Sequence, residues 1–136
     1  MIDRDTVIAL HEAGHCIVAR CLALRCGGAM VADGCGRAVY QDEVDDSVAV
    51  IIAHMAGAAA ESVLTGRIAD GIAGDREQIV SACAARDLTQ DECDRFWRTT
   101  CTLVRANETS IRRVAVELQR RRALSGVEID AIAWPR

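Results

Sequence analysis

The sequence predicts a mainly α-helical fold, a compact helical bundle of about five to six helices with a small β-hairpin after the first helix. Apolar residues make up 51% of the chain but aromatic residues only 3%, which suits closely packed helices better than a β-sandwich. The one proline, Pro135, is next to the last residue. A chain of 136 residues is long enough for one domain with a core and short for two. We therefore expect a single domain over residues 1–136.

The first helix is expected from about Asp5 to Leu24, with Asp3 or Asp5 as its N-cap and a stop near Gly27-Gly28. A short β-hairpin should follow. Its strands are predicted over Ala29 to Ala32 and Arg37 to Tyr40, with Asp33-Gly34 in the turn.

The second helix is expected from Asp46 to Thr65 and should end at Gly66. It is almost wholly apolar from Val48 to Ala60, as a central core helix would be. A capping box at Ser125 and Glu128 predicts the start of a last short helix. The other expected elements are a loop over Arg67 to Gly74, and helices from Asp75 to Arg86, from Thr89 or Asp91 to Asn107, from Glu108 to Arg122 and from Ser125 to Trp134.

Charge and hydropathy bear on the partners and on the location of the protein. The net charge of −4 gives no reason to expect nucleic acid as a partner. The longest apolar stretch, Val48 to Ala60, contains His54 and is followed by Glu61, so no membrane-spanning segment is expected. No signal peptide is apparent at the charged start of the chain. We expect a cytoplasmic protein.

In that compartment the seven cysteines should be reduced thiols. Cys26 and Cys35 flank a glycine-rich segment without the spacing of a structural zinc site. Five cysteines lie in helical patterns and are expected to be small core residues: Cys16, Cys21, Cys83, Cys93 and Cys101.

His11, Glu12 and His15 form an H-E-x-x-H motif inside the first predicted helix. Residues four apart lie on the same helix face, so both imidazoles can reach one metal ion. The glutamate beside the first histidine can act as general base on a metal-bound water. The alternative is a solvated helix face without a metal. It is disfavoured because small and apolar neighbours such as Gly14 and Cys16 indicate a buried helix, in which polar groups need partners.

A catalytic zinc ion usually takes three protein ligands and keeps one position open. His54 is a candidate for the third ligand, although a lone histidine on an apolar helix is more often a hydrogen-bonded core residue. Glu61, on the second helix, is another candidate. Asp75 is the third, with the alternative role of an N-cap. The spacing leaves Glu61 and Asp75 both open.

Four segments together resemble, in order, the peptidase domain of the FtsH-type, ATP-dependent zinc metalloprotease family. The first, His11 to Ala19, resembles the signature H-E-A-G-H-A-[VI]-[VA]-A. The second, Ala56 to Glu61, resembles G-G-R-x-A-E, with Ala58 where that family usually has arginine. The third, Gly71 to Ile79, resembles T-G-A-x-[ND]-D-[LI]-x-x-A. The tail, from Val114 to Ile129, resembles the closing helices.

The resemblance implies a zinc site with His11, His15 and Asp75 as metal ligands, Glu12 as the catalytic base and Glu61 close behind the metal as a second-shell residue. It also implies that the hairpin lies beside the substrate cleft, where it could pair with an extended peptide. No segment resembles a nucleotide-binding loop, so a stand-alone domain without the ATPase module is expected.

The expected function is that of a zinc-dependent metallopeptidase, an endopeptidase in which Glu12 assists the attack of a zinc-bound water on a peptide bond. The alternative is a weak or inactive peptidase-like domain that binds a peptide or a partner protein. The expected partners are a peptide or unfolded protein substrate, with a separate ATPase and a homo-oligomer as further possibilities.

Overall fold

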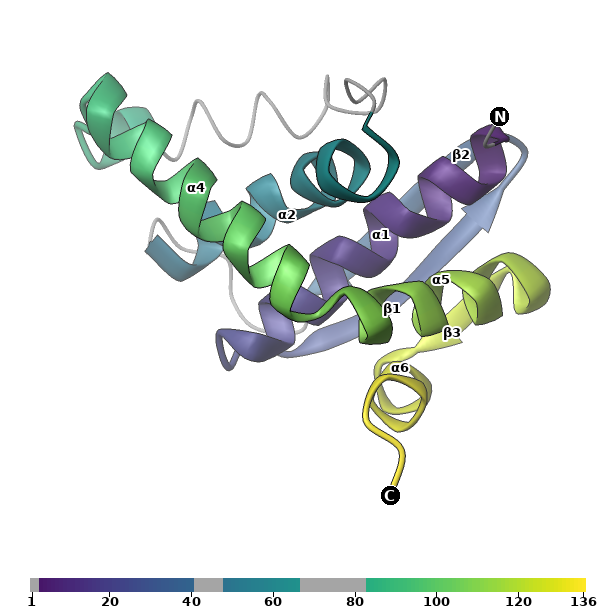
Figure 1. Cartoon of the computed structure of the whole chain (residues 1–136). Helices are drawn as coiled ribbons and strands as arrows, with labels where there is room; N and C mark the ends of the chain where they lie inside the picture. The colour runs from purple at the N-terminus through teal and green to yellow at the C-terminus, as the bar shows by residue number, and fades with distance from the viewer. Residues whose placement is uncertain (1–2, 41–47, 67–82) are drawn as a thin grey trace.

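The computed structural model describes residues 3–40, 48–66 and 83–136 and is mostly helical, as predicted. Helix α1 (Arg4–Cys21) lies at the centre and packs against α2 (Val48–Thr65), α5 (Glu108–Arg121) and the hairpin (Figure 1). The other described elements are the strands β1 (Cys26–Ala32), β2 (Cys35–Tyr40) and β3 (Ala123–Ser125), and the helices α4 (Gln90–Ala106) and α6 (Gly126–Ala133).

Helix α1 begins as predicted and ends earlier than predicted. The Asp3 carboxylate caps it by accepting a hydrogen bond from the Thr6 backbone N–H at 2.8 Å. The predicted end at Leu24 is wrong because Ala23 adopts a left-handed conformation with φ of 62°. The backbone N–H of Leu24 then donates to the Ala19 carbonyl, which is the Schellman way of closing a helix.

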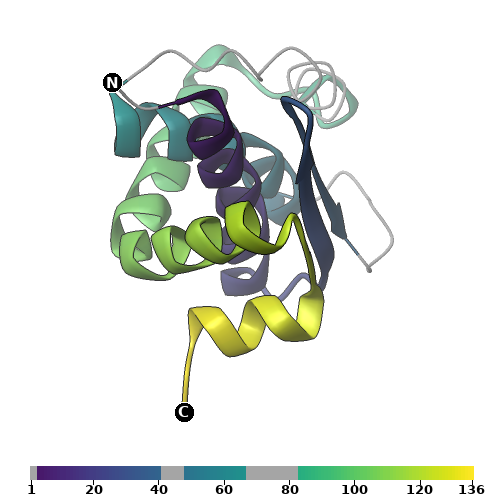
Figure 2. The same ribbon diagram turned by 90° about the vertical axis from the view of Figure 1, so that its right-hand side faces the viewer.

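The predicted hairpin is confirmed, and both strands are longer than predicted. Strand β1 begins earlier, at Cys26, and strand β2 begins closer to the turn, at Cys35. Asp33 and Gly34 form the turn, both with positive φ, as the tight turn of a hairpin requires. Strand β3 was not predicted. It pairs antiparallel with β1, so the sheet order is β2-β1-β3 and β2 is an edge strand in the part of the chain that the structure describes. Figure 2 shows the hairpin standing along one side of the helices.

Three predicted helices are confirmed within one or two residues. Thr89 caps α4 through a capping box with Glu92, and Ser125 caps α6 in the same way with Glu128. Helix α5 turns four apolar residues inward: Ile111, Val114, Ala115 and Leu118. The predicted loop from Arg67 to Gly74 and most of the helix predicted from Asp75 to Arg86 lie outside the described residues; of that helix, residues 83–85 are helical.

Helix α2 starts at Val48 in the described residues and ends at Thr65, where Gly66 takes a φ of 69° as predicted. By length and composition α2 could also span a membrane, whereas no segment of the sequence was expected to do so. In this fold 72% of α2 is buried, which is equally a feature of the core helix of a soluble protein. It packs between α1 and α4.

The prediction that five cysteines are small core residues is correct only in part. Cys16 and Cys101 are buried. Cys21 is exposed because it is the last residue of α1, and Cys83 and Cys93 are half-buried.

Candidate metal centre

The contact between α1 and α2 is unusually close where the candidate site lies. A Cβ atom added to Gly14 of α1 would come within 2.6 Å of the Ala60 Cβ and 2.9 Å of the Ala56 carbonyl oxygen. Gly14 is buried, as its small and apolar neighbours indicated. Glycine at this position therefore allows the two helix backbones to approach, at a cost to helix propensity of roughly 1 kcal/mol relative to alanine.

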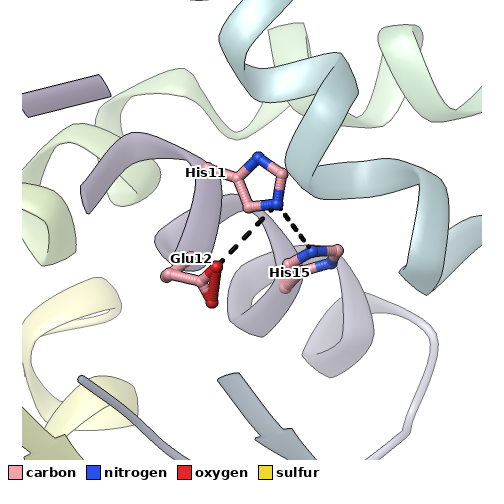
Figure 3. Close-up of side chains that lie close together, drawn as sticks. All are labelled: His11, Glu12 and His15. Atoms are coloured by element: carbon pink, nitrogen blue, oxygen red, sulfur yellow. Dashed lines mark hydrogen bonds and ion pairs between the residues drawn. The ribbon is translucent and has the colours of Figure 1, made fainter. Parts of the chain in front are cut away.

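His11, Glu12 and His15 converge in this closely packed region (Figure 3). The Nε2 atoms of the two imidazoles are 3.2 Å apart, and the rings meet edge to face at an interplanar angle of 76°. A Glu12 carboxylate oxygen lies 3.8 Å from Nε2 of His11. All three side chains are buried, with exposed fractions of 4–6%. In the described residues they form a His-Glu-His group whose ligand atoms all lie within 4.8 Å of one another, so the group could hold a metal ion.

The outer nitrogen of each ring is tied to helix α2. Nδ1 of His15 donates a hydrogen bond of 2.7 Å to the Ala53 carbonyl oxygen, which can only accept. Nδ1 of His11 donates to the Glu61 carboxylate at 2.6 Å. With Nδ1 protonated in both rings, each Nε2 carries a lone pair, and the two lone pairs point into the same space. This is the tautomer that metal-ligating histidines adopt.

The spacing of the two nitrogens fits a zinc-like ion. Two ligand nitrogens of a tetrahedral zinc ion lie about 3.3 Å apart, given Zn–N bonds of about 2.0–2.1 Å. The observed separation of 3.2 Å agrees with that value. A cation between the two nitrogens would bind both lone pairs at once. The donor set and its geometry therefore fit a divalent cation of the zinc type.

One face of α2 supplies the whole second side of the site. Ala53, Gly57 and Glu61 are four residues apart and therefore lie one above the other on that face. Ala53 holds His15 and Glu61 holds His11. A Cβ atom added to Gly57 would collide with Nε2 of both histidines, so Gly57 leaves open the space that the two lone pairs share.

Glu61 stands behind His11. Its Oε1 contacts Nδ1, on the far side of the ring from Nε2, which is the position of a carboxylate that orients a metal-ligating histidine. This position fits the second-shell role that the resemblance implies. The other carboxylate oxygen, Oε2, is buried and has no hydrogen-bond partner in the described part of the chain.

The remaining candidates from the sequence stand apart from the group. Asp75, the metal ligand that the resemblance implies, lies outside the described residues, so its role stays a prediction. His54 is buried on α2 but does not belong to the His-Glu-His group in the described residues. Cys16 follows His15 directly. Its pKa is raised well above the ordinary thiol value by the neighbouring Cys26 thiol and by burial.

The hairpin contacts the site through Gly36 of β2. A Cβ atom added to Gly36 would lie 2.8 Å from Cγ and 3.2 Å from Cδ of Glu12, so the edge strand passes directly beside the carboxylate. Sequence reasoning missed Gly36, Gly57 and the Ala53 carbonyl. The four-residue interval between Gly57 and Glu61 was a usable signal, because a glycine inside an alanine-rich helix indicates a close neighbour.

Comparisons with known proteins add no identification. No protein-family model matches the chain, and a search of curated proteins finds no match.

Proposed function

We propose that this protein is a zinc-dependent metallopeptidase that cleaves a bound peptide or an unfolded segment of a protein. One observation supports the proposal most strongly, namely that two imidazoles with opposed Nε2 atoms and a carboxylate share one buried space. Burying three such groups costs desolvation free energy unless interactions with their partners compensate for it. A divalent metal ion with an acid–base carboxylate beside it accounts for all three.

His11 and His15 would hold the metal through Nε2, with Asp75 as the third ligand that the resemblance implies. The metal would supply Lewis-acid activation of a water molecule and of the scissile carbonyl. Glu61 and the Ala53 carbonyl would keep the two imidazoles in the ligating tautomer.

Glu12 would move the proton. In peptide hydrolysis a C–O bond forms between water and the carbonyl carbon, and the C–N bond breaks. Glu12 would take the proton from the attacking water and deliver it to the leaving amine nitrogen. The distance of 3.8 Å between a Glu12 carboxylate oxygen and Nε2 of His11 supports this role beside a metal ion that His11 would hold.

The edge strand β2 gives this site a means of holding an extended chain. Strand β2 pairs with β1 on one side only in the described residues, and Gly36 brings it against Glu12. A peptide added to the outer edge as a further strand would run past the carboxylate, with main-chain hydrogen bonds supplying sequence-independent affinity. A peptide or unfolded segment is therefore the favoured substrate. A separate ATPase would be the partner that unfolds larger substrates, and self-assembly would be a further property to measure.

The test is cleavage of a fluorogenic peptide library by the protein loaded with zinc, compared with the protein treated with a chelator. Elemental analysis should show that Glu12→Gln retains zinc. Its kcat/KM should be lower by a factor of about 10² to 10⁴, the usual contribution of a general base. Glu108→Gln, a change on the exposed face of α5, is the matched control and should leave turnover unchanged.

Two results would oppose the proposal. Turnover by Glu12→Gln at the rate of the unaltered protein would remove the assigned base. Zinc retention without any cleavage by the unaltered protein would favour the alternative function, a peptidase-like domain that binds a peptide or a partner without cutting it.

A further inference from the structure

We propose that Cys83 and Cys93 form a reversible disulfide, which makes this pair a site of oxidative modification separate from the metal centre. The two sulfur atoms lie 3.5 Å apart, within hydrogen-bond distance for thiols. Both side chains are half-buried, so a small oxidant can reach them while the fold still restricts their movement. Disulfides in reducing compartments are usually transient and serve redox sensing or catalysis.

The turn between the two cysteines is fixed at both ends. On the Cys83 side, Asp87 takes a left-handed conformation with φ of 53°, and the Leu88 backbone N–H donates to the Cys83 carbonyl at 3.1 Å. On the other side, Thr89 caps α4 through its capping box with Glu92, and Cys93 lies in the first turn of that helix. The short distance between the sulfurs is therefore set by two local capping motifs.

Packing restricts the pair further. Cys83 contacts a small apolar cluster around Ile51 and Met55 of α2, to which Leu88 and Phe96 also belong. A bond between the sulfurs would tie this cluster to the start of α4 and close a loop from residue 83 to residue 93. In the described residues no third histidine, cysteine or acidic side chain completes a metal-binding group around the pair. A disulfide is therefore favoured over a bound metal.

The chemistry balances with hydrogen peroxide as the oxidant. The Cys93 sulfur attacks one peroxide oxygen, the O–O bond breaks, and water leaves with a sulfenic acid at Cys93. The Cys83 sulfur then attacks the Cys93 sulfur, the S–O bond breaks, and the Cys83 proton leaves with the hydroxide as a second water. Two thiols and one peroxide thus give one disulfide and two waters. Burial raises the pKa of the Cys83 thiol to about 11, which lowers its thiolate fraction and disfavours Cys83 as the sulfur that attacks the peroxide first.

The chain offers an internal comparison in Cys16 and Cys26. Both thiols donate to the same Gly28 carbonyl, but their exposed fractions are only 0% and 7%. An oxidant in solution should reach the half-buried pair first. Reaction at Cys83 and Cys93 before Cys16 and Cys26 would show that exposure and proximity together select the site.

The experiment oxidises the whole folded protein with hydrogen peroxide and maps the product with trypsin under non-reducing conditions. Trypsin cuts after Arg76, Arg86 and Arg95, so Cys83 and Cys93 fall on separate peptides, 77–86 and 87–95, each with one cysteine. We expect these peptides to be linked, with a mass about 2 Da below the sum of the two reduced peptides, and to separate again with a dithiol reductant. The oxidised protein should also melt a few degrees higher, by about 4 °C.

Two variants and one unfolded control complete the test. Cys35→Ser, at an exposed cysteine of the hairpin, should retain the link, and Cys93→Ser should lose both the link and the rise in melting temperature. Oxidation in urea should give mixed pairings, with the 77–86/87–95 pair enriched at least about tenfold in the native protein relative to urea. Peptides recovered unlinked from the native protein, or pairing no more selective than in urea, would overturn the proposal. Zinc that the unaltered protein binds at Cys83 and Cys93, and that Cys93→Ser loses, would also overturn the proposal.

Discussion

The α1–α2 contact and the α5–α6 end of the molecule differ in where their polar and charged side chains lie. Between α1 and α2, two histidines and two glutamates are buried within the core, at exposed fractions of 2–6%. In α5 the buried residues are apolar, and the charged side chains form ion pairs on the surface, such as Glu108 with Arg112. The first arrangement carries a large desolvation cost and the second almost none.

The difference indicates where function lies. Buried polar groups persist when partners compensate their desolvation, and at the α1–α2 contact each imidazole has one nitrogen held by α2 and the other facing its neighbour. Surface ion pairs on α5 satisfy charge without defining a shared space. Substitutions at the α1–α2 contact should therefore affect metal binding. Substitutions of surface charges at the α5–α6 end should change only the stability of the protein, and only slightly.

The largest expected effect is that of Gly57→Ala. The added methyl would collide with Nε2 of His11 and of His15, rings that their Nδ1 hydrogen bonds keep from turning away. The collision also overpacks the α1–α2 contact, at a cost of about 1–3 kcal/mol that the gain in helix propensity, roughly 1 kcal/mol, offsets in part, so a circular dichroism spectrum should accompany the zinc measurement to check that the variant is folded. Zinc affinity should fall at least about 100-fold, as measured by competition with a chromophoric chelator.

Gly14→Ala is the matched comparison for that variant. Its methyl would meet Ala60 and the Ala56 carbonyl, at the helix crossing. The overpacking should lower the free energy of unfolding by about 1–3 kcal/mol. If Gly57→Ala bound zinc as tightly as the unaltered protein, the shared space between the two nitrogens would not be the metal position.

The next effect in size is that of Glu61→Gln. The amide oxygen can still accept from Nδ1 of His11, but the charge that strengthens this 2.6 Å hydrogen bond is lost. Loss of a carboxylate behind a ligating histidine typically weakens metal binding 10- to 100-fold, and we expect zinc affinity to fall by about that factor. Complete loss of zinc would instead identify Glu61 as a direct ligand, and Glu108→Gln serves as the control.

The sequence predicted the parts of this comparison that depend on local spacing. His11, Glu12 and His15 share one helix, and the cap at Ser125 is a four-residue motif, so each could be found from a short window, whereas the start of α4 was left open between Thr89 and Asp91. The Ala53 carbonyl and Gly57 could not be assigned to the site, because their roles arise from contact between α1 and α2, 38 or more residues apart along the chain.

Two fold details also escaped prediction. The end of α1 uses Ala23 in a left-handed conformation, where glycine is the residue that pattern reasoning expects. Strand β3 has only three residues and owes its existence to pairing with β1. Ala23 was missed because residues other than glycine rarely adopt this conformation, and β3 was missed because a run of three residues is too short for its alternation to be recognised.

The smallest expected effect is that of Glu128→Gln at the α6 cap. Hydrogen bonds from the Ser125 backbone N–H and side chain, followed by the charge of Arg121, lower the pKa of the Glu128 carboxyl. Because the pKa is lower in the folded state, the charged carboxylate stabilises the fold at any pH above its pKa in the unfolded chain, which is about 4.3. This contribution is lost as the pH falls through the pKa of the folded state. Glutamine keeps a capping acceptor without the charge.

The measurement is the melting temperature of the two proteins from pH 7 to pH 3. At pH 7 Glu128→Gln should melt no more than about 2 °C below the unaltered protein, since the group is exposed and its ion pair is weak. The difference should shrink once the pH falls below the unfolded value of about 4.3, and it should also shrink in high salt. A difference that stayed undiminished at pH 3 would show that the amide disturbs the cap itself, and the stability of the α5–α6 end would then depend on more than surface charge.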